Sequence, residues 1–388
     1  MKRALFVLLC SALLPAAVPA QSLFGARGLG IPVEPVDSRA RILGGVGVGL
    51  LGVNPSLVNP AELAAVRRGV TAVLQPATHS LQLGGGEEDV SSTRFPLLSL
   101  LYPVNERLVF GLGYGGYLEQ SWGVQASGTL PIGDGLDYDD VARSRGGLSQ
   151  LRLSAAYALS PALSVGAAAG MLTGNLDRSL TRTFDDSTAS FRNFSTRLRW
   201  EYGGAIGAVG AQWQPLPALR LAASLALTTD IDADSAAGPA QSRSYGSAMI
   251  AAAGASGELT SDLLVAIGAT RQRFPELDSE VEASRETWAF GGGLEYSGLR
   301  SGRRTFPIRV GARWQQLPYH AIGEEAAREV AGGVGIGFRL ATDATGPLAV
   351  LDTGLERARR TGLAGSAIAE GIEESLWRWT LSLSLFGR

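Results

Sequence analysis

The C-terminal end of the chain alternates strictly between apolar and polar residues. From Trp377 to Leu385 every odd position is apolar, and every even position is Arg, Thr or Ser. A period of two places the apolar side chains on one face of a β-strand and the polar side chains on the other. One face toward lipid and one toward a polar lumen is typical of strands in an outer-membrane β-barrel.

Period-two segments recur along most of the chain and predict an all-β fold. We expect a transmembrane antiparallel β-barrel of about fourteen strands, an even number of the kind that single-chain bacterial barrels have. Aromatic residues gather near the ends of several segments, as they do at membrane interfaces. The expected strands cover residues 70–84, 92–102, 106–128, 143–159, 162–184, 191–214, 218–231, 244–258, 261–274, 285–299, 304–318, 329–342, 346–358 and 375–386.

Short and long connections alternate between these strands. Residues 160–161 and 214–217 are short and contain proline, so we interpret them as periplasmic turns. The longer polar stretches are predicted to be extracellular loops, at residues 129–146, 184–192, 232–243, 274–284 and 318–328.

The first twenty residues have the layout of a secretory signal peptide. Lys2 and Arg3 precede an apolar run over residues 4–14, and small residues reach Ala20 at the expected cleavage site. The run is too short for a transmembrane helix. Past it, no uncharged apolar stretch is long enough to span a membrane as a helix. The predicted organisation is a signal peptide at 1–20, an N-terminal plug at 21–66 and a barrel at 67–388.

The predicted plug differs in composition from the strands that follow it. Residues 21–66 are rich in glycine and contain four prolines that would interrupt a β-ladder. Residues 60–65 can form a short helix, with Asn59 as cap and Pro60 at its first position. Because the segment is too apolar for stable disorder, we predict that it lies in the lumen. The alternative is a disordered periplasmic tail.

Composition narrows the function classes. After the predicted signal peptide the chain has no cysteine and no lysine, and 32 arginines face 36 acidic residues, for a net charge of −4. This balance does not suggest nucleic-acid binding. Two histidines are too few for a metal cluster, so neither a metal nor a cofactor is expected.

Eight arginines share the strand register that is expected to face away from lipid. One interpretation is that some of them bind the carboxylate of an amphipathic ligand, because guanidinium offers a two-pronged contact. The other is that they pair with luminal acids such as Glu201 and Glu295 and hold the plug. The eight are Arg152, Arg197, Arg199, Arg220, Arg309, Arg313, Arg339 and Arg378, of which Arg152, Arg197, Arg199, Arg309 and Arg313 are the ligand-binding candidates.

The two histidines are the candidates for a catalytic base. A hydrolase would need a histidine beside a serine and a carboxylate or amide partner. His79 lies on the first expected strand and His320 in an expected loop, and neither context indicates catalysis. We therefore predict no catalytic residue and no enzymatic activity.

The N-terminal segment resembles the hatch of FadL-type outer-membrane transporters, the OmpP1/FadL/TodX family. The resemblance rests on a glycine-rich stretch at 44–49, on Asn54-Pro55, and on Asn59-Pro60-Ala61 just before the first strand. It implies fourteen strands around an N-terminal hatch, with Asn54, Asn59, Pro60 and Ala61 as hatch or gating residues. It also implies passive uptake of hydrophobic compounds such as long-chain fatty acids or aromatic hydrocarbons, by hatch movement and lateral release into the outer membrane.

The partners that follow from this interpretation are a hydrophobic ligand, outer-membrane lipid and, through the C-terminal strand 375–386, the barrel assembly machinery. A monomer is expected. The alternatives are a general porin with an open charged constriction, a structural or secretion-associated barrel that holds a partner protein, and, more distantly, an outer-membrane hydrolase.

Overall fold

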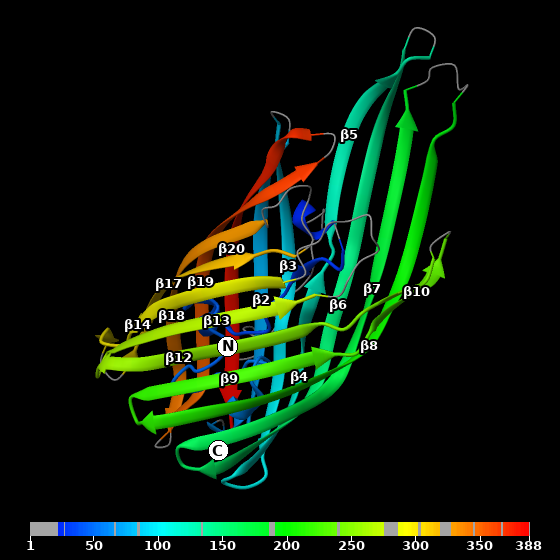
Figure 1. The fold of residues 1–388 in the computed structure, drawn as a ribbon. Helices are drawn as coiled ribbons and strands as arrows, with labels where there is room; N and C mark the ends of the chain where they lie inside the picture. The colour runs from blue at the N-terminus through cyan, green and yellow to red at the C-terminus, as the bar shows by residue number, and fades with distance from the viewer. Residues whose placement is uncertain are drawn as a thin grey trace, which may run out of the picture.

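A closed ring of fourteen antiparallel strands forms the body of the computed structural model (Figure 1). Each strand pairs with the next, and β20 closes the ring against β2, from Gly69 opposite Phe386 to Gln82 opposite Glu373. The prediction of a fourteen-strand antiparallel barrel is confirmed. The structure describes residues 22–26, 28–65, 67–83, 86–132, 135–185, 191–238, 241–274, 286–301, 304–318, 327–343, 346–365 and 368–387.

The barrel strands are β2 (Gly69–Leu83), β3 (Gly86–Pro103), β4 (Leu108–Glu119), β6 (Leu136–Ser160), β7 (Leu163–Phe184), β8 (Phe194–Leu216), β9 (Leu219–Thr228), β12 (Met249–Thr260), β13 (Leu263–Arg273), β14 (Glu286–Tyr296), β17 (Ile308–Gln316), β18 (Arg328–Asp343), β19 (Gly346–Gly365) and β20 (Ile368–Phe386). The remaining elements are η1 (Leu23–Gly25), β1 (Ile31–Pro32), α2 (Ser38–Ile42), η2 (Pro60–Ala65), β5 (Trp122–Leu130), β10 (Ile231–Ala237), β11 (Arg243–Tyr245), β15 (Arg300–Ser301) and β16 (Arg304–Thr305).

The outer surface of the ring is apolar, as the alternation predicts. In β20, Trp377 and Trp379 are about half exposed, whereas Arg378 and Thr380 are buried on the inner face. Outward-facing aromatic residues recur around the ring, among them Tyr157, Trp213 and Phe290. In water a continuous exposed apolar band would be unfavourable, so this band is the lipid-facing surface of a transmembrane barrel. No helix within the described ranges is long and apolar enough to cross a membrane.

The prediction of an extracellular loop at 129–146 is wrong. These residues belong to a long hairpin, because β5 pairs with β6 from Trp122 opposite Ser144 to Leu130 opposite Leu136. The predicted strand at 106–128 is in turn divided into β4 and β5 by Gln120 and Ser121. Outside the membrane both faces of a strand can meet water, so its residues lose the apolar alternation that marks a strand in lipid.

Residues 22–65, here called the N-terminal segment, lie within the ring of strands. Ser38 donates hydrogen bonds to β20, the Leu51 amide donates one to Ser256 of β12, and Asn59 donates to β8. β8 and β12 flank β9, and β20 lies across the barrel from them, between β19 and β2. The segment is almost entirely buried. The predicted signal peptide, residues 1–20, lies outside the described residues.

Candidate functional site

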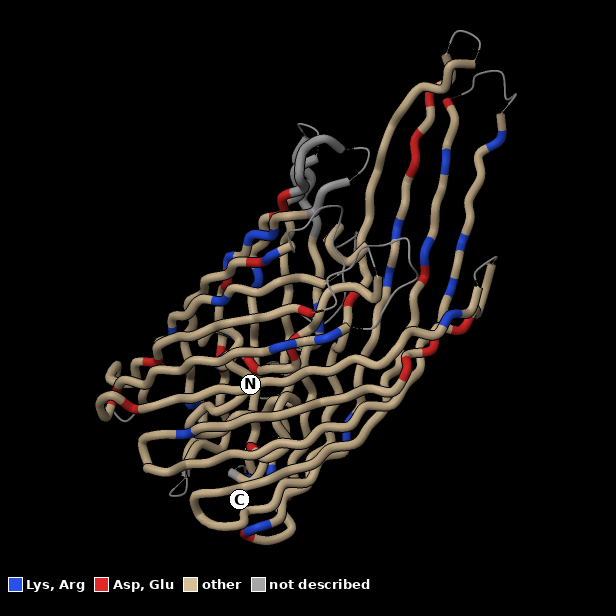
Figure 2. Tube along the Cα trace, in the orientation of Figure 1, with Lys and Arg blue, Asp and Glu red and all other residues tan. Residues whose placement is uncertain are grey.

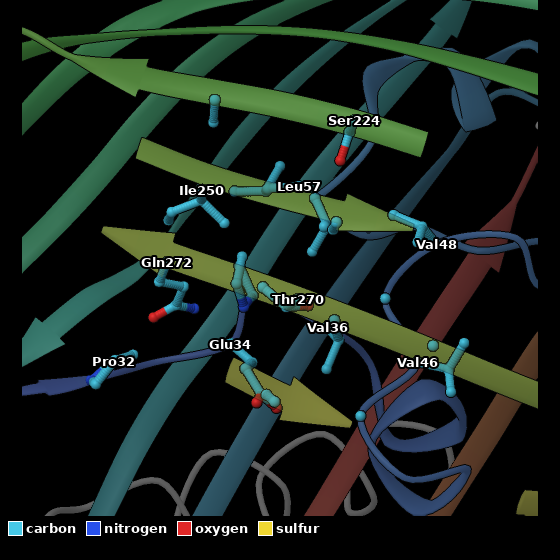
Figure 3. Close-up of a pocket in the computed structure, with 18 of the residues that line it drawn as sticks. Pro32, Glu34, Val36, Val46, Val48, Leu57, Ser224, Ile250, Thr270 and Gln272 are labelled. Atoms are coloured by element: carbon cyan, nitrogen blue, oxygen red, sulfur yellow. The ribbon is translucent and has the colours of Figure 1, made fainter. Parts of the chain in front are cut away.

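An enclosed cavity of about 80 Å³ lies between the N-terminal segment and the barrel wall (Figure 3). Val36, Val46 and Val48 line it from the N-terminal segment, and Ile250 and Ala252 line it from β12. Its few polar side chains include Glu34, Gln150, Arg152, Thr270 and Gln272. A mostly apolar cavity with a few convergent polar groups is the usual form of a small-molecule site.

Asn59 and Ala61, two of the residues that the family resemblance assigns to the hatch, hold the N-terminal segment against the barrel wall. The side chain of Asn59 caps η2 by accepting a hydrogen bond from Ala61 N (3.0 Å) and donates to Ala211 O (3.2 Å). Ala61 O accepts a hydrogen bond from Ser164 Oγ at 3.0 Å. A Cβ at Gly166 would lie 2.5 Å from the backbone of Pro60 and Ala61, so only glycine allows this approach.

Asn54 holds the fold of the segment itself. Its Nδ2 donates to Gly47 O at 3.1 Å and to the carboxylate of Glu62. Glu62 also accepts a hydrogen bond from the Gly49 amide. The glycine-rich stretch is thereby fastened to η2, next to the cavity.

Glu62 is a functional candidate that the sequence reasoning missed. It is 1% exposed, and Arg220 of β9 lies nearby and donates to Leu50 O and Gly52 O. Burial raises the pKa of Glu62 to about 7, against the opposing effect of its hydrogen bonds to Gly49 and Asn54. The signal in the sequence that could have indicated Glu62 is that it is a single acidic residue in an otherwise apolar stretch.

Arg309 and Arg313 lie in buried ion pairs with acids, as the second interpretation of the arginines predicts. Arg309 Nε lies 2.6 Å from Glu295, and Arg39 of α2 binds the same carboxylate at 2.7 Å. Arg313 pairs with Glu329 at 2.5 Å and with Glu356 at 3.4 Å. The charged network thus joins β14 and β17–β20 to the N-terminal segment.

Arg152 has a different environment. It is 4% exposed, lines the cavity, and donates to Leu57 O at 3.0 Å. No ion pair joins it to an acid in the described part of the chain, and its Nε is buried without a hydrogen-bond acceptor. Tyr117 Oη and Gln150 Oε1 are also buried without partners there and line the same cavity. All three side chains line the cavity, so they are candidates for polar contacts with a ligand there.

Arg197 and Arg199 are exposed, and the structure does not bring them together with the other three candidates. Both share the outward face of β8 with Val209 and Trp213, and Arg199 pairs with Asp177 at 2.9 Å. The prediction that these two side chains face inward is therefore wrong. The projecting end of β8 reverses the pattern, because its outer face meets water and its inner face, with Trp200 and Tyr202, packs on an apolar cluster.

The barrel wall loses a strand pairing beside the cavity. β3 pairs with β4 only from Leu98 opposite Tyr114 to Pro103 opposite Val109. Beyond Tyr114, β1 takes the vacated edge, with Ile31 opposite Glu119 and Val33 N donating to Tyr117 O at 2.9 Å. An ion pair between Arg94 and Glu119 crosses the gap between β3 and β4.

A groove opens at this gap. Thr93 and Phe95 of β3 line it, with Tyr114 and Glu119 of β4. Val33 and Leu118 line both this wall groove and the enclosed cavity. These two apolar side chains therefore separate the cavity from the groove.

A second opening lies at the opposite end of the N-terminal segment from η1. This opening, here called the vestibule, is lined by a group of charged side chains and by apolar ones such as Leu264 and Phe338, and the charged group is Asp37, Arg39, Glu295, Arg309 and Asp352. Burial and the nearby Asp352 raise the pKa of Asp37 to about 6. The β17–β20 side of the lumen is thus charged, whereas the cavity side is apolar.

His79 has neighbours that resemble a catalytic triad. Its Nδ1 contacts Glu374 at 2.5 Å and its Nε2 contacts Ser92 at 3.2 Å. All three residues are buried, and none lines the cavity, the wall groove or the vestibule. A nucleophile needs room for its substrate, so this geometry fits an internal structural contact. His320 lies outside the described residues.

The comparisons with known proteins agree with this fold. A Pseudomonas aeruginosa FadL homologue is 15% identical, with a TM-score of 0.59 and coverage of 92% of this chain and 99% of that one. The Pseudomonas putida toluene transporter TodX is 13% identical (TM-score 0.58; coverage 92% and 100%), and the Ralstonia pickettii toluene transporter TbuX is 15% identical (TM-score 0.57; coverage 92% and 99%). No curated protein matches the chain.

The geometry defines the class as a transmembrane β-barrel with the fold of FadL-type structures, as the sequence resemblance predicts. A family model described as BamG matches residues 1–264, so the chain belongs to the BamG family.

Proposed function

We propose that the chain is a passive outer-membrane channel for hydrophobic compounds, in which the N-terminal segment is a movable hatch. The observation that carries the proposal is the pair Val33, directly after β1, and Leu118 of β4, which are the only two described residues that line both the apolar cavity and the wall groove. Moving the two side chains apart would join the inside of the barrel to its wall.

The polarity of the lumen favours exit through the wall. A hydrophobic ligand gains free energy by leaving water and loses it on entering a charged, hydrated space. The vestibule presents Asp37, Glu295 and Arg309, whereas the way toward the wall begins at the apolar side chains of Val33 and Leu118. The wall groove beyond them carries the Arg94–Glu119 ion pair, but it reaches the lipid-facing surface at Phe95 and Tyr114, so we propose release sideways into the membrane rather than downward into the periplasm.

The ligand class follows from the cavity and is supported by the structural neighbours. TodX and TbuX are described as toluene transporters, and a third neighbour, CymD, as a monoaromatic hydrocarbon channel. We extend this class to aromatic hydrocarbons, long-chain fatty acids or similar lipids for this chain. A cavity of about 80 Å³ holds several water molecules, so a longer ligand requires hatch movement.

A disulfide that locks β1 to β4 tests the proposal. A Cβ at Gly116 would lie 3.1 Å from that of Val33, close enough for a disulfide after a small shift. The double variant V33C/G116C is expressed in a bacterial host that lacks its own hydrophobic-compound channels, and uptake of labelled toluene and oleate is measured. The predicted mature chain has no other cysteine.

Uptake is expected to stop in the oxidised double variant and to return with reductant, whereas V33C and G116C alone retain it. If the oxidised variant takes up both compounds at the wild-type rate, the lateral route is wrong. If the wild type itself transports neither compound, the uptake function is wrong and a structural or secretion-associated role gains support.

A general porin is the weaker alternative. The lumen is filled by the N-terminal segment, and a porin needs an open aqueous passage. Single-channel recordings separate the two, because the hatch model predicts conductance far below that of an open barrel of this size. We also propose that the role is non-enzymatic and that the chain acts as a monomer in outer-membrane lipid, assembled through β20 by the barrel assembly machinery.

A further inference from the structure

Strands β5–β8 project beyond the rest of the barrel as a separate sheet (Figure 1). A tilted strand crosses the bilayer in about 9–11 residues. β6 has 25 residues, β7 has 22 and β8 has 23, so much of each strand lies outside the membrane. The two-residue turns after β6 and β8 lie at the other end, so the projection is extracellular.

The two faces of the projecting sheet differ: the lumen-side face carries aromatic and apolar side chains around the Asp140–Arg182 ion pair, whereas the opposite face is polar. Tyr138, Leu180 and Phe194 face the lumen side, where Leu180 and Phe194 are 39% and 44% exposed. Charged residues recur along these strands as blue and red segments in Figure 2, and the face opposite the lumen side carries charged and hydroxyl side chains. They include Asp137, Asp139, Arg143, Asp177, Thr181 and Arg197.

β5 is a free edge of this sheet. It pairs with β6 in one unbroken register, and no strand in the described ranges pairs with its other side. Its nine residues, WGVQASGTL, contain no charge and no proline. Natural proteins protect long exposed edges with lysine, proline, bulges or covering elements, because bare edges recruit other strands. Among the described residues, cover over β5 is found only at its beginning, where Trp122 and Val124 pack on η1.

The opposite edge of the same sheet is protected. There β8 presents Arg197 and Arg199, and β10 pairs with it across a register shift between Ser235 and Ala237. β10 also carries Asp232 and Asp234. The projecting sheet therefore has one edge protected by charged residues, here called the guarded edge, and one edge without charge at β5, here called the unguarded edge.

The strand that leads into the unguarded edge already pairs with an added strand from this chain. β4 leads into β5, and β1 pairs with β4 at Leu118 and Glu119, where β3 has separated. Beyond Ile31 the N-terminal segment turns away at Gly30, which has a φ of 94°. Strand addition thus begins on β4 and stops before β5.

We propose that β5 docks an extended segment of a partner protein outside the membrane, by β-strand addition. Backbone hydrogen bonds to Gln125–Leu130 would supply affinity, and side-chain alternation would supply selectivity. The partner segment is uncharged, with apolar side chains on the face shared with Val124 and Leu130 and polar ones on the face shared with Gln125 and Ser127. The proposal is independent of the uptake function.

A second copy of this chain fits the edge poorly. Two copies inserted in the same direction are related by an axis along the membrane normal, which also runs roughly along the projecting strands. Such an axis would pair β5 with its copy in parallel and set the lumen-side face of one sheet beside the polar face of the other. A small hydrophobic ligand is also a poor occupant, because it cannot satisfy the free backbone groups of the edge.

Crosslinking in cells tests the proposal. The full-length protein carries a photoactivatable amino acid at Gln125, or at Ser195 on the guarded edge as a control, in the cells where it naturally occurs. Mass spectrometry then identifies what is joined to each position. We expect one partner polypeptide at Gln125, attached through an extended uncharged segment, and none of it at Ser195.

Two lysine variants show whether the edge itself is used. Ala126→Lys adds a charge to the unguarded edge, on the face that β5 shares with Asp140 of β6, and is expected to reduce the Gln125 adduct about tenfold, whereas Ser195→Lys leaves it unchanged. Toluene uptake, which does not involve β5, stays at the wild-type level in both and shows that they fold. An adduct with lipid only, an adduct with a second copy, no adduct, or an adduct that Ala126→Lys leaves intact would each overturn the proposal.

Discussion

A Cβ atom at Gly166 would lie 2.5 Å from the backbone nitrogen of Ala61. This glycine of β7 is the seat on which η2 rests, because the Ala61 carbonyl also accepts a hydrogen bond from Ser164 on the same strand. Backbone cannot move aside as a flexible side chain can. The position therefore couples the barrel wall directly to the hatch.

We predict that Gly166→Ala loosens the hatch while the barrel stays closed. Overpacking of this kind costs about 1–3 kcal/mol. Single-channel recordings are expected to show more frequent and larger openings than in the wild type. Gly207→Ala on β8 is the matched control, because its nearest heavy atom would be Ala168 O at 3.9 Å. Equal conductance in the two variants would show that the close approach at Gly166 does not hold η2 in place.

The alternation of the chain predicted the barrel well but could not say everything about its faces. Period two separates the two faces of a strand, and in β20 it correctly placed Trp377 outward and Arg378 inward. At the top of β8 the same period placed Arg197 and Arg199 on the wrong side. Alternation does not show where a strand leaves the membrane, and there the face that meets water changes.

The candidate site was harder to predict, because it depends on contacts between distant residues. The Asn59-Pro60-Ala61 motif marked where the segment docks, but its seat at Gly166 lies about a hundred positions away. The break between β4 and β5 left no clear trace in the sequence. Glu62 matters through its hydrogen bonds with Gly49 and Asn54, which no periodicity reveals.

Hatch docking is predicted to weaken as the pH rises from about 4.5 to 7. Burial raises the pKa of Glu62 from 4.5 to about 7, so the docked hatch holds a proton that an undocked one releases. The gain in docking free energy is complete below pH 4.5, is lost as the pH passes 7, and is on the order of 3 kcal/mol. Arg220 opposes the shift but does not cancel it.

Hydrogen exchange of residues 44–62 at pH 5 and pH 8 measures this effect. The wild type should exchange faster at pH 8 than base catalysis of exchange alone explains. Glu62→Gln should remove most of that excess, leaving a smaller step near pH 6 from Asp37. An excess of equal size in Glu62→Gln would assign the effect to another group.

Arg152 is predicted to select for anionic ligands. It is buried at the cavity without an acidic partner in the described structure, so a ligand carboxylate can become its partner. A hydrogen bond to a charged group contributes about 1.5–3 kcal/mol, which corresponds to roughly a tenfold to hundredfold change in affinity. Arg152→Ala should weaken laurate binding by that factor and leave toluene within about twofold.

Arg199→Ala is the control for this comparison. Arg199 is exposed on the outer face of β8, paired with Asp177, so its loss should alter neither laurate nor toluene binding. Isothermal titration of the purified, detergent-solubilised variants supplies the dissociation constants. If Arg152→Ala weakens both ligands equally, the residue shapes the cavity and does not recognise charge.

Glu329 is predicted to be the most sensitive charged residue of the barrel. It is fully buried and binds Arg360 at 2.7 Å and Arg313 at 2.5 Å, with Arg378 at 3.5 Å. Glu329→Gln leaves these arginines short of one negative charge in a space that water does not reach. Removing one partner of a buried ion pair costs about 3–5 kcal/mol.

Heat-dependent loss of the folded band on gels, or urea unfolding in detergent, measures the stability of this variant. Glu373→Gln is the matched control, because Glu373 pairs with Arg359 at the barrel surface, where both side chains are about half exposed. A surface pair of this kind contributes about 0–1 kcal/mol, so the control should unfold close to the wild type. If both variants unfold together, the internal network does not stabilise the β17–β20 side of the barrel, and the packing of α2 against those strands must do so instead.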